Sequence, residues 1–137
     1  MSNSYNLQKL IDGPRNVVLK VDVSLDGSGD YTNPQTIVNV KTLSSMGPTF
    51  GPNPNRVRVD ILDWDVQDGL SIYLWWDGAG PMPVWRMVGR SIEKAFHIGG
   101  LQNNADQPNG NITMTTASAQ NGVPLVATFK IHCVKLN

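Results

Sequence analysis

The chain has 137 residues, and its 11 lysines and arginines balance 11 aspartates and glutamates, so the formal net charge is zero. Binding to nucleic acid or to an anionic membrane through charge requires a basic surface, and we therefore expect neither partner. A chain of this length buries enough surface to form one domain, here residues 1–137, without disulfides or bound metal. No cofactor is expected.

Turn-forming residues dominate the composition. The acidic residues are ten aspartates and one glutamate, beside 13 glycines and nine prolines. Because Asp, Gly and Pro favour turns whereas Glu favours helices, we expect little helix. No apolar run approaches the about 20 residues of a membrane-spanning helix, and the first twelve residues lack the features of a signal peptide. The N-terminus is expected to be flexible, and the protein to be made in the cytoplasm.

Alternating apolar residues predict strands from the first third of the chain onward. A strand with one apolar face is predicted over residues 15–24, followed by a loop over residues 26–30 and a second strand over 35–43. Residues 44–55 hold three prolines and two glycines and are predicted to form a long loop available for function.

The next pattern predicts a β-hairpin. Residues 56–66 and 70–77 both alternate, and Asp68-Gly69 between them is a typical hairpin turn. If Leu70 and Trp76 point inward with the residues in phase with them, Tyr73 and Trp75 point outward. Leu62 and Trp64 are expected on the same outer face.

The second half of the chain predicts further strands. Residues 83–88 favour a short edge strand, 90–96 are the only segment expected to form a helical turn, and 111–116 and 125–136 alternate as strands. About seven or eight strands separated by turns predict an all-β fold, an antiparallel sandwich of jelly-roll type, with a closed barrel as the alternative.

No catalytic constellation is evident, so we do not expect an enzyme. The imidazoles are those of His97 and His132, and neither lies in a nucleophile motif. His132 and Cys133 are adjacent on a predicted strand, so their side chains point to opposite faces and cannot form a thiolate–imidazole pair.

Two groups of aspartates are candidate cation sites. The first comprises Asp60, Asp63, Asp65 and Asp68, and the second Asp26 and Asp30. The spacing of the first group departs from that of an EF-hand loop, and the second fits an ordinary turn. We predict no metal site, and the sequence leaves cation binding by either group open.

Aromatic residues give the strongest indication of a binding surface. Four tryptophans lie between positions 64 and 85, and Trp76 is in phase with the predicted core. Tryptophan and tyrosine are enriched at the centres of protein interfaces. The predicted partner-contact residues are Phe50, Trp64, Tyr73, Trp75 and Trp85. An outward aromatic pair would also suit a carbohydrate-binding module.

Five short segments carry a family resemblance. They are residues 13–20 (GPRNVVLK), 25–30 (LDGSGD), 68–77 (DGLSIYLWWD), 98–104 (IGGLQNN) and 110–116 (GNITMTT). Their motifs and their order resemble those of a family of small proteins from tailed bacteriophages. Asn111 stands where that family usually has Asp, and Met114 where it usually has Leu. The loop over 44–55 lies outside the resemblance.

The resemblance implies a structural component of the virion, without catalytic residues. Capsid decoration, in which a cement protein binds the head shell, is the first expectation, and a neck, tail or fibre component is the alternative. The implied partners are the major capsid protein or other virion proteins and further copies of this chain, with a trimer suggested by analogy with capsid symmetry. The expected location is the virion, and an edge strand is one expected means of attachment.

Overall fold

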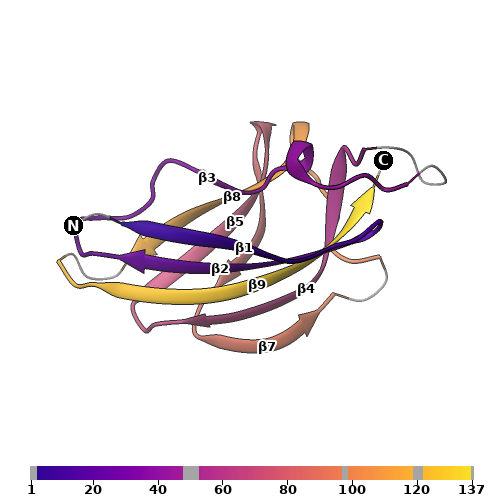
Figure 1. Cartoon of the computed structure of the whole chain (residues 1–137). Helices are drawn as coiled ribbons and strands as arrows, with labels where there is room; N and C mark the ends of the chain where they lie inside the picture. The colour runs from indigo at the N-terminus through magenta and orange to yellow at the C-terminus, as the bar shows by residue number, and fades with distance from the viewer. Residues whose placement is uncertain (1–2, 48–52, 97–98, 119–121, 137) are drawn as a thin grey trace.

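The computed structural model describes residues 3–47, 53–96, 99–118 and 122–136, in which nine strands form two antiparallel sheets (Figure 1). The strands are β1 (Ser4–Asp12), β2 (Asn16–Leu25), β3 (Gln35–Val38), β4 (Arg56–Val66), β5 (Leu70–Gly80), β6 (Met82–Met87), β7 (Arg90–Ala95), β8 (Asp106–Ser118) and β9 (Leu125–Leu136). Within the described ranges, one 3-10 turn, η1 (Val40–Thr42), follows β3. The predicted all-β fold is confirmed, with nine strands instead of seven or eight.

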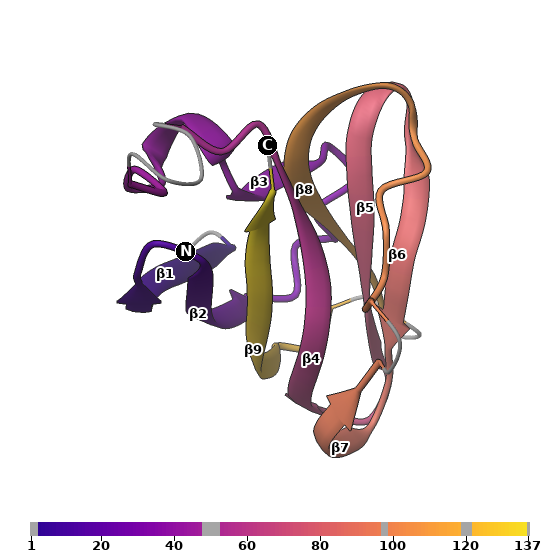
Figure 2. The same ribbon diagram turned by 90° about the vertical axis from the view of Figure 1, so that its right-hand side faces the viewer.

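The two sheets form a jelly roll. Sheet A has the order β1-β2-β9-β4-β7, and sheet B has the order β3-β8-β5-β6. Figure 2 shows the two layers edge-on. Strands β2 to β9 pair as β2 with β9, β3 with β8, β4 with β7 and β5 with β6, which is the pattern of one long hairpin rolled around a core. The structure is therefore an open sandwich and not a closed barrel.

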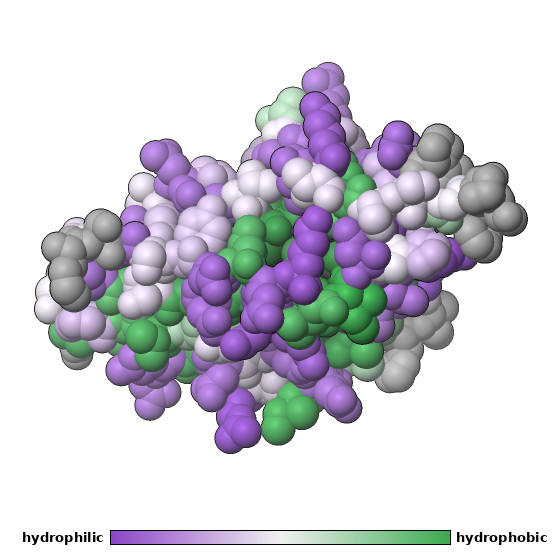
Figure 3. Space-filling model, viewed as in Figure 1, coloured by the Kyte–Doolittle hydropathy of each residue, from purple (hydrophilic) through white to green (hydrophobic). Residues whose placement is uncertain are grey.

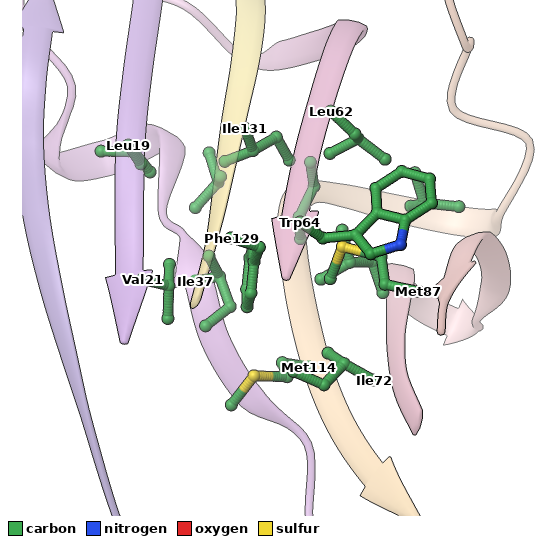
Figure 4. Packing of buried hydrophobic residues seen from close by; sticks show 14 of the residues in the cluster. Leu19, Val21, Ile37, Leu62, Trp64, Ile72, Met87, Met114, Phe129 and Ile131 are labelled. Carbon is green, nitrogen blue, oxygen red and sulfur yellow. The ribbon is translucent and has the colours of Figure 1, made fainter. Parts of the chain in front are cut away.

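The core lies between the two sheets and is built from the inward positions of each strand. In β2, Val17, Leu19, Val21 and Val23 are buried, and in β9 the buried residues include Phe129, Ile131 and Cys133. Figure 4 shows part of this packing. The strands predicted over 15–24 and 125–136 are thus confirmed, including their inward faces.

The hairpin predicted over residues 56–77 is wrong, although its turn is right. Gly69 has a φ of 91°, and the amide of Leu70 donates to the carbonyl of Gln67, as expected for a tight turn. However, β4 pairs with β7 and β9, whereas β5 pairs with β6 and β8. The apolar faces of β4 and β5 meet across the sandwich, and the turn carries the chain from one sheet to the other.

Other element predictions are corrected by sheet pairing. Residues 90–95 form β7, not a helical turn, because they pair with β4 as an edge strand. The strand predicted over 35–43 ends at Val38 and gives way to η1. The N-terminal segment, expected to be flexible, contains β1, which pairs with β2 along its length.

A buried lysine fixes the start of the 44–55 loop. The side chain of Lys135 is fully buried, and its Nζ donates to the carbonyls of Gly13 and Ser44 at 2.6 and 2.8 Å and to Ser44 Oγ at 2.9 Å. The same Nζ lies 2.6 Å from Asp12 Oδ1. This network joins β9, the β1–β2 turn and the loop at one end of the sandwich.

Candidate partner-contact surface

The structure separates the five predicted contact residues. Tyr73 and Trp75 lie half-buried on the outer face of sheet B, whereas Trp64 is only 9% exposed and belongs to the core. Trp85 packs at the edge of the sandwich. Phe50 lies outside the described residues.

Tyr73 and Trp75 form an ordered aromatic pair. Their ring centroids are 6.2 Å apart with an interplanar angle of 25°. The indole Nε1 of Trp75 donates to Thr115 Oγ1 at 2.9 Å. The guanidinium of Arg86 lies 5.6 Å from the Tyr73 ring centroid and donates to Ser71 Oγ at 3.2 Å. We call Ser71, Tyr73, Trp75, Arg86 and Thr115 the aromatic patch.

Register explains why the patch forms. Tyr73 lies directly between Arg86 of β6 and Thr115 of β8, so the three side chains form a row across the outer face of sheet B. Such cross-strand neighbours are close enough for cation–π and hydrogen-bonding contacts. The patch is therefore held in place before any partner binds.

Trp64 is buried because β4 contains a bulge. Between Val59 and Ile61 the register of β4 against β9 shifts by one residue. The residues that follow therefore change face, and Leu62, Trp64 and Val66 point into the core. The indole Nε1 of Trp64 donates to the carbonyl of Val88 at 3.0 Å, and Figure 4 places Trp64 among the core residues. The prediction that Leu62 and Trp64 face outward is wrong.

Trp85 closes one side of the sandwich. Its ring makes an edge-to-face contact with Phe96, with centroids 4.8 Å apart, and Lys94 Nζ lies 5.9 Å from its centroid. Because Trp85 belongs to β6 of sheet B and Phe96 follows β7 of sheet A, this contact bridges the two sheets. Trp85 is therefore separate from the aromatic patch.

The outer face of sheet A carries a second surface that the sequence analysis missed. Pairing aligns Ile11, Val18, His132, Ile61 and Ala95 in one row across all five strands. We call this set the apolar row. Figure 3 looks onto this face and shows hydrophobic surface at its centre, interrupted by hydrophilic side chains. The β4 bulge brings Ile61 into the row, so strict alternation could not reveal it.

His132 and Cys133 lie on opposite faces, as predicted. His132 lies in the apolar row, with Nε2 3.3 Å from Asn16 Oδ1. Cys133 is fully buried, and burial raises the pKa of its thiol, which keeps the thiol protonated. His97 lies outside the described residues.

Three of the candidate cation ligands, Asp30, Asp60 and Asp63, have partners within the chain. Asp63 pairs with Lys130 at 3.0 Å, and Asp60 pairs with Arg58 at the same distance. Asp30 accepts hydrogen bonds from Thr116 Oγ1 and from the amide and hydroxyl of Ser118. Among the residues that the structure describes, no group of three or more His, Cys, Asp or Glu is arranged to hold a metal ion.

Comparison of this chain with protein-family models, with curated proteins and with solved structures finds no match. Within the described part of the chain, no helix is long and apolar enough to cross a membrane.

Proposed function

We propose that this protein is a non-enzymatic structural component of a tailed-bacteriophage virion that decorates the capsid by binding the head shell. The observation that carries the proposal is the aromatic patch. Trp, Tyr and Arg are the residue types most enriched at the energetic centres of protein interfaces, and here one of each is fixed on a single face. Because Thr115 and Ser71 already hold these side chains, little conformational entropy is lost on binding.

Three further features support a place in a protein shell. The apolar row gives the opposite face of the sandwich its own contact surface, which suits a protein enclosed by neighbours. The zero net charge limits repulsion between copies packed closely together. Jelly rolls also build viral capsid domains, although lectins and cupins share the fold, so topology alone does not select the function.

The proposed partner is the major capsid protein, and the proposed location is the virion. Attachment at the neck, tail or a fibre would use the same patch with a different partner. A carbohydrate-binding module is the second candidate, because the Tyr73–Trp75 pair is also the kind of aromatic surface on which sugars stack.

Replacing Trp75 or Tyr73 with alanine is expected to weaken binding to empty expanded capsids by at least about tenfold, since both residues occupy the centre of the proposed contact. The measurement is cosedimentation of the purified protein with capsids that lack it. Ile92→Ala is the matched control, because Ile92 is 70% exposed but lies on sheet A. Circular dichroism shows whether each variant is folded.

Full capsid binding by both folded aromatic variants would contradict the proposed contact. Loss of binding on Ile92→Ala alone would place the contact on sheet A. The carbohydrate alternative predicts instead that tryptophan fluorescence changes on titration with glycans and that the Trp75 variant loses this change.

A further inference from the structure

The two sheets together expose four edge strands, which are β1 and β7 in sheet A and β3 and β6 in sheet B. An edge strand presents unpaired backbone N–H and C=O groups, and proteins normally protect such strands against pairing with other chains. The four edges of this protein differ sharply in how well they are protected.

Three of the edge strands have features that hinder pairing with another chain. β3 has only four residues. β6 has six residues, among them Pro83, which has no N–H to donate. β7 has six residues, a register shift opposite β4 and the charged residues Arg90, Glu93 and Lys94. Glu93 also has a φ of 51°, which interrupts the regular strand.

β1 lacks most of this protection. It has nine residues and no proline, and its regular run over residues 4–9 precedes a register shift between Lys9 and Ile11. Leu7, Leu10 and Ile11 are 41%, 46% and 52% exposed. Exposed apolar side chains on a long edge strand are a typical site of strand pairing. Figure 1 shows β1 at the end of sheet A, with β2 on one side only.

The charged groups of β1 are already paired within the chain. Lys9 Nζ donates to the carbonyl of Thr42 at 2.8 Å and lies 3.6 Å from Asp12 Oδ2. Asp12 in turn contacts Lys135. β1 therefore presents a nearly neutral edge, which does not repel an identical strand.

We propose that β1 pairs antiparallel with β1 of a second copy of this chain, across a twofold axis at Leu7 or Gln8, and so joins two copies of sheet A into one continuous sheet. Rotation about a twofold axis perpendicular to the sheet places the outer faces of both copies of sheet A on the same side. Both copies contribute the same strand, so the contact is isologous. With the axis at Leu7, Lys9 lies opposite Tyr5, and with the axis at Gln8 it lies opposite Leu7. No like charges meet in either register, so the edge is compatible with itself.

This pairing goes beyond the proposed function and does not depend on it. It also departs from the trimer suggested by the family resemblance, because an isologous edge contact closes at two copies. A strand of a different protein would use the same edge, but it would leave the purified chain monomeric.

The test introduces a positive or a negative charge at Gln8, which is exposed and lies within one residue of the axis in both registers. Analytical ultracentrifugation of the full chain is expected to show a dimer. Gln8→Lys and Gln8→Glu are each expected to raise the dimer dissociation constant at least about tenfold, because two like charges then lie directly opposite each other with the axis at Gln8, or diagonally on the same face with the axis at Leu7. An equimolar mixture of the two variants is expected to recover the dimer as a heterodimer.

Ile92→Lys, which adds the same charge to the opposite edge of sheet A, is the control and is expected to remain dimeric. A monomeric or trimeric wild type would overturn the proposal, and so would undiminished dimerisation of both Gln8 variants. Recovery of the dimer in the mixture excludes misfolding as the cause of the loss, because a misfolded variant would not recover. Failure of the mixture to reassociate, with both variants folded by circular dichroism, would also overturn the proposal. No capsid is present in this experiment, so its result is independent of the capsid-binding test.

Discussion

Replacing Lys135 with methionine is expected to lower the free energy of unfolding by about 3–5 kcal/mol, the usual cost of removing one partner from a buried ion pair. Methionine fills similar space but removes the ammonium group that contacts the Asp12 carboxylate and donates to the carbonyls of Gly13 and Ser44. Urea denaturation at neutral pH measures the change.

Lys130→Met is the matched control. Lys130 lies on the same strand and pairs with Asp63 at 3.0 Å, but its side chain is 45% exposed. Because an exposed ion pair contributes little, this variant is expected to lose less than about 1 kcal/mol. Equal losses for the two variants would contradict the structural role assigned to Lys135.

The pH dependence of the same variant provides a second measurement. Burial opposes ionisation of Asp12, but hydrogen bonds from Lys135 and Ser44 outweigh it and lower the pKa from 3.8 to about 2. A lowered pKa stabilises the folded state above pH 3.8, and this stabilisation is lost as the pH falls through 2. The stability difference between wild type and Lys135→Met should therefore narrow across this range. A difference that stays constant would contradict the role of the Asp12 charge.

Trp64→Ala is expected to cost about 3–5 kcal/mol of folding stability, because it removes a buried indole and leaves a cavity between the sheets. It also leaves the carbonyl of Val88 without the indole donor. Thermal and urea denaturation measure the loss. Trp75→Ala is the control, since Trp75 is half-buried on the outer face and its removal opens no core cavity.

The two tryptophans thus separate stability from binding. Trp64→Ala is expected to unfold more easily, and Trp75→Ala is expected to stay folded and lose capsid binding. A stable Trp64→Ala variant that lost capsid binding would instead support the outward position expected from strict alternation.

Local periodicity predicted most strands but not how they are arranged. β2 and β9 keep a regular two-residue alternation, so their buried faces could be predicted residue by residue. For β4 and β5 the same pattern could not distinguish strands that pair side by side from strands that face each other across the core. That difference depends on which strands pair with β4. Its partners, β7 and β9, come later in the chain than β5, so local periodicity does not identify them.

The sequence also contains a sign of the buried lysine. Lys135 is in phase with the inward residues Ile131 and Cys133, so the alternation of the last strand places a charge on the apolar face. A lysine on an inward position must be paired if it is buried. Asp12 and Ser44, its partners, are distant in the sequence and could not be identified from spacing.

The candidate site was only partly predictable for the same reason. Tyr73 and Trp75 were correctly expected on the outer face of β5, because β5 has no register shift between Leu70 and Trp76 against β8. The bulge in β4 was not visible in the sequence, and it moves Trp64 into the core while bringing Ile61 into the apolar row. The extra residue in this bulge therefore removes Trp64 from the predicted contact surface and adds Ile61 to the apolar row.

The number of copies in the virion tests the central claim most directly. If the proposal is right, this chain is found in purified virions of a tailed phage, and quantitative mass spectrometry of those virions measures its ratio to the major capsid protein. A decoration protein is expected in hundreds of copies, at a fixed ratio to the shell. Absence from the virion would contradict the account, and a count of about six or twelve copies would contradict shell decoration and indicate a ring at the neck or tail.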